Sequence, residues 1–119
     1  MKQIRYNAPA VLLLLLTMQP ALAHHNTGAM FDLGQEVSLQ GTISRYEWKN
    51  PHLYFFVEVV NDEDEQTEWR IEAGPLAIMR RLGWSRDSLR VGDQVVVTGS
   101  PSRKAGKTSA FLKAISSAD

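Results

Sequence analysis

The sequence predicts an all-β fold with one short helix, arranged as a five-stranded OB-type barrel. Most of the chain after residue 36 divides into short runs with the alternation of β-strands, and only one segment has a helical pattern. The order is three strands, the helix and two more strands, as in an OB barrel whose helix closes one end. A β-sandwich, or an open sheet with a helix on one face, would give much the same pattern.

The first three predicted strands form a meander. Apolar and polar residues alternate over residues 37–48, until Asn50-Pro51 breaks the strand because proline fixes φ and biases the preceding residue toward an extended or turn conformation. Residues 53–60 are apolar at nearly every position, which is typical of a central strand. The acidic run 61–65 predicts a solvated hairpin tip, and alternation over 68–73 predicts the third strand.

The second half of the predicted barrel contains the helix and two strands. Gly74-Pro75 favours a helix start, because proline is tolerated at the first helical position, and Gly83 ends the helix after about two turns. A polar connection leads to a fourth strand at 94–98, a basic loop follows over 99–108, and a fifth strand is expected at 109–116.

The amino terminus has the three parts of a secretory signal peptide. A basic start precedes an apolar run over residues 11–16, and small residues at Ala21 and Ala23 complete a cleavage site. The run is too short to cross roughly 30 Å of hydrocarbon, so no membrane span is expected after cleavage. We therefore expect a cleaved signal peptide at 1–23, an extended arm at 24–36 that is held by Met30 and Phe31, and a barrel domain at 37–119 in a periplasmic or secreted protein.

Composition limits the partners and the chemistry. The chain has no cysteine, which excludes disulfides and a lipidated amino-terminal cysteine. Loss of Lys2 and Arg5 with the signal peptide leaves a net charge of −2. Because nucleic-acid binders usually carry a strong basic excess, this balance predicts that nucleic acid is not a partner.

Three histidines make the most specific candidate site. Cleavage after Ala23 would leave His24 as the mature terminus, so that its amine and its imidazole could bind one metal ion, with His25 or His52 as further nitrogen donors. Such a donor set favours copper, although zinc and nickel also accept imidazole. The arm is long enough to fold back over the barrel end that carries His52, where Asp32 or Glu47 could fix an imidazole tautomer.

Other interpretations of the same residues stay open. His24 and His25 could be a mobile polar end, and His52 could pack on Trp48 or bond to a backbone carbonyl. An OB-type surface for an oligosaccharide, a peptide or an envelope protein could instead form from the aromatic rings of Trp48, Tyr54, Phe56 and Trp69 and from a loop with Arg103, Lys104 and Lys107, unless those rings fill the core.

The sequence favours a binding protein over an enzyme. It contains no nucleophile elbow, no phosphate loop and no carboxylate pair beside an acid-base histidine. A copper-dependent oxidase is the one catalytic alternative, since a terminal histidine that holds copper resembles the arrangement of secreted copper oxygenases.

Several short motifs together resemble a family of small exported bacterial proteins, domain of unknown function 6152. They are His24-His25, Phe31-Asp32, the segment 47–52 with Asn50-Pro51-His52, Gly83-Trp84, the segment 86–89, Gly92-Asp93 and the segment 97–99. The resemblance implies an exported, β-barrel-like domain in which the paired histidines and the Asn-Pro-His element recur, and it implies no activity. The chain departs from the family at Asn26 and Thr27, where serine and an aromatic residue are frequent.

Overall fold

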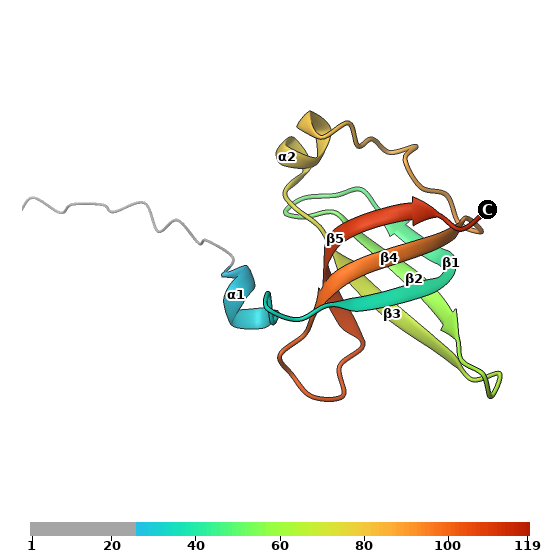
Figure 1. Ribbon diagram of the computed structural model, residues 1–119. Helices are drawn as coiled ribbons and strands as arrows, with labels where there is room; N and C mark the ends of the chain where they lie inside the picture. The colour runs from blue at the N-terminus through green and yellow to red at the C-terminus, as the bar shows by residue number, and fades with distance from the viewer. Residues whose placement is uncertain (1–25) are drawn as a thin grey trace, which may run out of the picture.

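The computed structural model describes residues 26–119, which form a closed five-stranded barrel (Figure 1). The predicted signal peptide and two of the three candidate ligands, His24 and His25, lie outside the described residues. In the part of the chain that is described, no helix has the length and apolar character needed to cross a membrane. The elements are α1 (Thr27–Met30), β1 (Val37–Glu47), β2 (Tyr54–Val60), β3 (Gln66–Glu72), α2 (Leu76–Arg81), β4 (Gln94–Pro101) and β5 (Ser109–Ser117).

The predicted fold class is confirmed. The strands are ordered β1-β2-β3-β5-β4 around the barrel, and α2 lies between β3 and β4 in the chain. Closure depends on a short parallel pairing of Arg70–Glu72 with Ser109–Phe111 and on an antiparallel pairing of β1 with β4. These connections and the helix position are those of an OB fold.

The core follows from the alternation along the strands. Inward side chains of all five strands form one buried cluster, with Ile43, Phe55, Val57, Ile71 and Val97 fully inaccessible. A second cluster joins α2 to the end of the barrel and consists of Leu53, Ala73, Leu76 and Met79. Because α2 contributes Leu76 and Met79 on one face, it covers this end.

Gly41 lies in the middle of β1, where the pairing of this strand changes from β4 to β2. The first half of β1 pairs with β4 and the second half pairs with β2, so the strand bends around the barrel at its middle. A Cβ atom on Gly41 would lie 2.2 Å from the carbonyl oxygen of Glu58 on β2. The close approach of these two backbones therefore requires glycine at this position.

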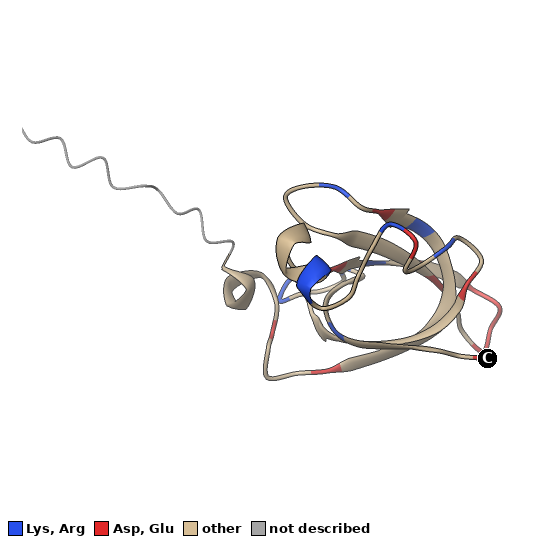
Figure 2. Ribbon diagram, turned by 90° about the horizontal axis from the view of Figure 1, so that it is seen from above, with Lys and Arg blue, Asp and Glu red and all other residues tan. Residues whose placement is uncertain are grey.

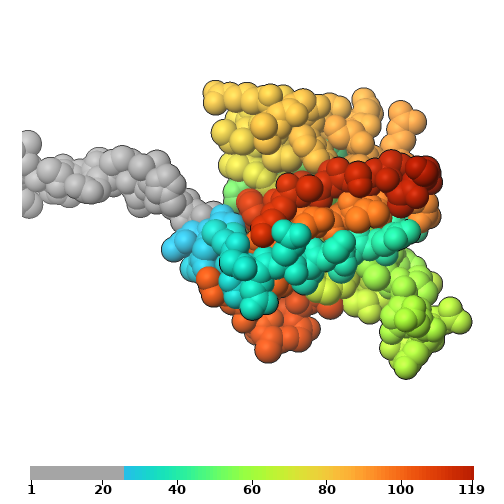
Figure 3. Space-filling view, viewed as in Figure 1, coloured from blue at the N-terminus to red at the C-terminus, as the bar shows by residue number. Residues whose placement is uncertain are grey.

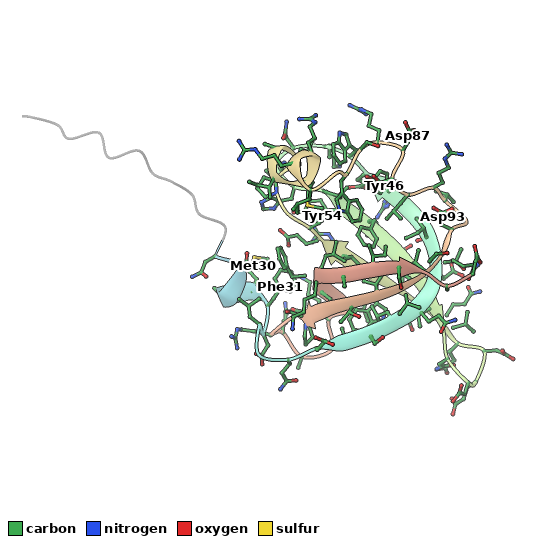
Figure 4. All side chains as sticks on the ribbon, turned by 45° about the horizontal axis from the view of Figure 1, so that its top comes forward. Met30, Phe31, Tyr46, Tyr54, Asp87 and Asp93 are labelled. Atoms are coloured by element: carbon green, nitrogen blue, oxygen red, sulfur yellow. The ribbon has the colours of Figure 1, made fainter. Side chains whose placement is uncertain are left out.

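The amino-terminal arm differs from the expected extended segment. Residues 27–30 form a single helical turn, because the carbonyl oxygens of Asn26 and Thr27 accept hydrogen bonds from the amides of Ala29 and Phe31. Phe31 is buried and bridges to Ser102, whereas Met30 is 39% exposed. Figure 4 shows Phe31 between α1 and the strands. Of the two residues expected to hold the arm, Phe31 does so.

Candidate functional site

His52 and Glu72 form a buried polar pair at the end of the barrel. His52 lies in the loop between β1 and β2, two residues before β2 begins, and its Nδ1 lies 2.9 Å from Oε1 of Glu72, the last residue of β3. Their side chains are only 13% and 1% exposed. Backbone hydrogen bonds of Leu53 with Ala73 and Gly74 hold the two segments together.

This pairing orients the imidazole for ligand binding. A carboxylate that accepts a hydrogen bond from Nδ1 fixes the tautomer in which Nε2 carries the lone pair. Metal-binding histidines commonly have such a carboxylate on their other ring nitrogen. The chemistry of His52 and Glu72 therefore fits a metal ligand and its supporting partner.

Tyr54 completes the surroundings of Glu72. Its hydroxyl donates a hydrogen bond to Oε1 of Glu72 over 3.4 Å, and the guanidinium of Arg70 lies 4.1 Å from the centre of its ring. Burial raises the pKa of Tyr54, and the negative charge of Glu72 raises it further. Tyr54 is therefore a neutral hydrogen-bond donor around neutral pH.

The arm is anchored next to this pair. The rings of Phe31 and Phe111 have centroids 5.7 Å apart, and Phe111 is the register partner of Glu72 across the β3–β5 pairing. The described chain begins at Asn26, five residues before Phe31, on the side of the barrel that carries α1 (Figure 1). The covalent connection to His25 thus starts near the end of the barrel that holds His52.

The carboxylates expected beside an imidazole have other partners. Asp32 accepts a hydrogen bond from the amide of Gly34, and Glu47 pairs with Arg45 and Lys49. Glu72 takes the role that was expected of them. A signal for Glu72 exists in the sequence, because counting equal distances from the hairpin tip at 61–65 places it opposite Tyr54, as the structure does.

The structure brings one of the three predicted ligands to a defined place. The side chain of His52 is held by the carboxylate of Glu72. Over residues 26–119, no group of three or more histidine, cysteine or carboxylate side chains is placed to hold a metal ion.

The predicted aromatic surface is divided between the core and the outside of the barrel. Trp69 packs against the main core cluster, and Trp48 packs against the cluster under α2. Phe56 and Tyr54 lie on the outer face of the sheet, where the guanidinium of Arg45 sits 3.8 Å from the Phe56 ring centre. Arginine side chains thus cover both outward rings.

The loop between β4 and β5 contacts the amino-terminal arm. Arg103 donates hydrogen bonds to α1 through its side chain and its backbone, while Lys104 and Lys107 are exposed. In Figure 3 this loop, in orange, lies directly against the blue and cyan arm. One of the three basic side chains that could have contacted a ligand therefore holds α1.

The chain belongs to a family of unknown function, DUF6152, whose profile matches residues 12–111. A comparison with curated proteins finds no match. Among solved structures, the mitochondrial single-stranded DNA-binding protein Rim1 of S. cerevisiae is similar, with a TM-score of 0.55 and 17% identity over 71% of this chain and 93% of that one. The N-terminal domain of PriB from Thermoanaerobacter tencongensis has a TM-score of 0.54 and 20% identity, over 72% and 98%. At these identities, the likeness concerns the fold.

The prediction that nucleic acid is not a partner is wrong. Rim1, which has a similar fold, is a single-stranded DNA-binding protein. The error lay in using net charge, because an OB surface binds single strands through a local set of aromatic and cationic side chains. Figure 2 shows basic and acidic segments interspersed around the barrel, so the total charge says little about any one face.

Proposed function

We propose that the protein is an exported, non-enzymatic metal-binding protein that handles copper. His24, with its amine and imidazole, would bind the ion together with His52, and His25 would be a further donor. The His52–Glu72 pair carries this proposal, because it presents an oriented imidazole near the anchored arm. Nitrogen donors favour Cu(II) among the first-row divalent metals.

The barrel supplies orientation in this proposal. Glu72 fixes the His52 tautomer, and the surrounding packing leaves the His52 side chain only 13% exposed. Phe31 fixes the point from which the arm leaves the barrel. In the sequence, His24 and His25 directly precede Asn26, the first described residue of this arm.

The test uses protein whose first residue is His24, as mass spectrometry of exported material should also find. Cu(II) affinity is measured by competition with a chelator for this protein, for the variant His52→Gln, and for a variant with one alanine added before His24. Glutamine can still donate a hydrogen bond to Glu72 but has no imidazole nitrogen. Both changes should weaken Cu(II) binding, while Lys107→Ala, a change in an exposed loop, should not. If neither change weakens binding, the proposed site is wrong.

An activity assay on the same copper-loaded protein distinguishes a metal-binding protein from a copper-dependent oxidase. A copper-dependent oxidase would form peroxide, or oxidise a substrate, in a reaction that requires His24. We expect tight binding without such turnover. Peroxide formation that disappears in a His24→Ala variant would favour the oxidase.

A second candidate function is suggested by the outer face of β1, β2 and β3. Arg45, Phe56 and Arg70 are register neighbours across the three strands, and Tyr54 lies beneath Arg70. Phe56 is only 8% exposed beneath Arg45, so this face offers mainly the guanidinium planes that cover the two rings. Unpaired bases stack on guanidinium planes, and OB folds bind oligonucleotides through this face. We propose single-stranded nucleic acid as the ligand for this face.

Fluorescence anisotropy with a labelled single-stranded oligonucleotide tests this second candidate. Binding should weaken with rising salt, because neutralised phosphates release counterions. Substitution of Arg45 and Arg70 by alanine should weaken it further, with Arg86→Ala, a change of an exposed cation in the loop between α2 and β4, as the control. Absence of binding at low salt, or equal binding by the double variant, would remove this candidate. An oligosaccharide, peptide or envelope protein stays a prediction for the same face.

A further inference from the structure

We propose that β5 and α2 form a groove that binds an extended acidic peptide as an additional β-strand. None of the described residues that line this groove belongs to the proposed metal site or to the arginine-covered face of β1, β2 and β3. The inference is therefore independent of both proposed ligands and concerns a partner of a third kind.

The second half of β5 has an open edge. Only Ser109, Ala110 and Phe111 pair with β3, whereas the antiparallel pairing with β4 continues to Ser117. In an antiparallel strand, about half of the main-chain amide and carbonyl groups point away from any one neighbouring strand. In the described chain, no strand pairs with the side of residues 112–117 that faces away from β4. The main-chain groups on this side can therefore pair with another backbone.

An apolar groove of about 450 Å³ lies between β5 and α2. Its volume is within the range of roughly 300–1,000 Å³ that is typical of ligand pockets. Ile78 of α2 and Leu82, which follows α2, line the groove and are 45% and 69% exposed, although both side chains are large and apolar. Figure 3 shows α2, in yellow, above β5, in red. An open strand edge and an exposed apolar helix face thus border the same space.

A peptide in an extended conformation fits both features. Its main chain can form ladder hydrogen bonds with β5, which supply affinity, while every second side chain enters the groove and supplies specificity. Natural edge strands are commonly protected from uncontrolled pairing by a lysine, a bulge or a covering helix. β5 carries Lys113 where its register with β4 shifts, next to the partners of Thr98 and Gly99, and α2 borders the groove. The edge is therefore suited to one short segment and not to a second sheet.

The charges around the groove favour an acidic peptide. Lys113 lines the groove, Arg81 is exposed next to Leu82, and no described residue of the lining is acidic. Nζ of Lys113 also lies 3.4 Å from Oε2 of Glu36, so Arg81 is the more available cation. Figure 2 shows the basic end of α2 in blue. A second copy of the chain would bring the same cations to this edge, which is repulsive, whereas the carboxylates of a peptide are attracted to them.

Fluorescence anisotropy with a labelled eight-residue peptide of alternating valine and glutamate tests the inference, on the same protein as the Cu(II) measurements. Leu82→Glu should weaken peptide binding at least about tenfold, because an apolar contact is lost and a repulsive charge is added. Val91→Glu is the matched control, because Val91 is 71% exposed and does not line the groove. Arg81→Gln should weaken binding at low salt and have less effect at high salt. Thermal unfolding of each variant checks that the barrel is intact.

Two further peptides test the pairing of main chains. One is N-methylated at every valine and the other at every glutamate, so that each lacks the amide donors of one edge. At least one of them should lose binding, because one edge of the bound peptide faces β5. Retention of binding by both, equal binding by the parent and Leu82→Glu, or no binding at millimolar protein would overturn the inference. Light scattering measures the mass of the free protein, and a dimer that Leu82→Glu dissociates would assign the groove to a second copy instead.

Discussion

At the scale of single residues, Glu72 is the least expected feature of the protein. The alternation of β3 places it on the outer face with Arg70, where a carboxylate would ordinarily be solvated. Instead it is 1% exposed and accepts hydrogen bonds from His52 and Tyr54. A period-two pattern assigns a side chain to a face, but it does not show which groups from a neighbouring loop cover that face.

The role of Glu72 can be tested by Glu72→Gln. The amide oxygen still accepts a hydrogen bond from His52, but the negative charge that strengthens Nε2 as a donor to metal is lost. We expect Cu(II) affinity to fall by about 10- to 100-fold, as for other residues that support a metal-binding histidine. Competition titration measures the affinity, and nitrogen chemical shifts report the His52 tautomer. Glu47→Gln is the control, and equal affinities of the two variants would contradict this role.

Tyr46 gives the protein a pH dependence that does not involve metal. Burial raises the pKa of Tyr46 from 10.0 to about 12, and the charge of Asp87 adds to the effect. Its hydroxyl donates a hydrogen bond to the carbonyl oxygen of Ser85, below the loop that carries Asp87 (Figure 4). The folded state thus retains a proton that the unfolded chain releases near pH 10. Stability from Tyr46 is complete below that pH and is lost as the pH rises through about 12.

Tyr46→Phe should therefore change stability by an amount that depends on pH. Near pH 8 the variant should be less stable by about 1 kcal/mol, the net value of one hydrogen bond. Near pH 11 the difference should be smaller, because the parent alone loses stability through this hydroxyl. Urea unfolding at both pH values measures the two differences. A difference that stays constant would show that the phenol does not titrate differently in the two states.

At the scale of elements, the sequence pattern located the strands and the helix but misjudged the arm. Glycine and proline at 74, 75 and 83 bound α2, which the structure confirms as Leu76–Arg81. The arm was expected to be extended because it has no apolar periodicity. Its helical turn depends on donors from Arg103, 75 residues after Gly28. Local propensity cannot reveal a turn that a distant residue stabilises.

The close approach of β1 and β2 at Gly41 predicts that a larger residue at this position destabilises the protein. Gly41→Ala would place a methyl group 2.2 Å from the backbone oxygen of Glu58, and a backbone atom cannot rotate away as a side chain can. We expect a loss of about 1–3 kcal/mol in the free energy of unfolding, as for overpacked cores. Gly34→Ala is the matched control, because its new methyl group would meet only the Asp32 side chain at 3.5 Å. Urea unfolding of both variants checks this, and equal stabilities would show that β1 and β2 can separate without cost.

At the scale of the whole molecule, the order of the elements predicted the closed barrel, but it did not show which residues pair to close it. The meander of β1, β2 and β3 follows from turn signals between neighbouring strands, whereas closure requires β3 to pair with β5 over three residues that lie about forty positions apart. No local pattern encodes such a pairing. The same holds for the site, since His52 was visible in the sequence while its partner Glu72 required the register between strands.

The proposed metal site predicts that Cu(II) stabilises the entire fold. In the proposed mature protein, His24 and His25 would remain at the chain end after unfolding, so an ion held by these residues alone would bind both states and would not raise the melting temperature. Only the part of the affinity that needs His52 in its folded position stabilises the barrel. A hundredfold preference for the folded state corresponds to about 2.7 kcal/mol at saturating metal, which for a domain of this size raises the melting temperature by roughly 10 °C or more. Thermal unfolding with and without Cu(II) measures the shift, which a chelator should reverse and His52→Gln should abolish. Tight Cu(II) binding without a change in melting temperature would show that copper binds to the chain end alone and that His52 is not a ligand.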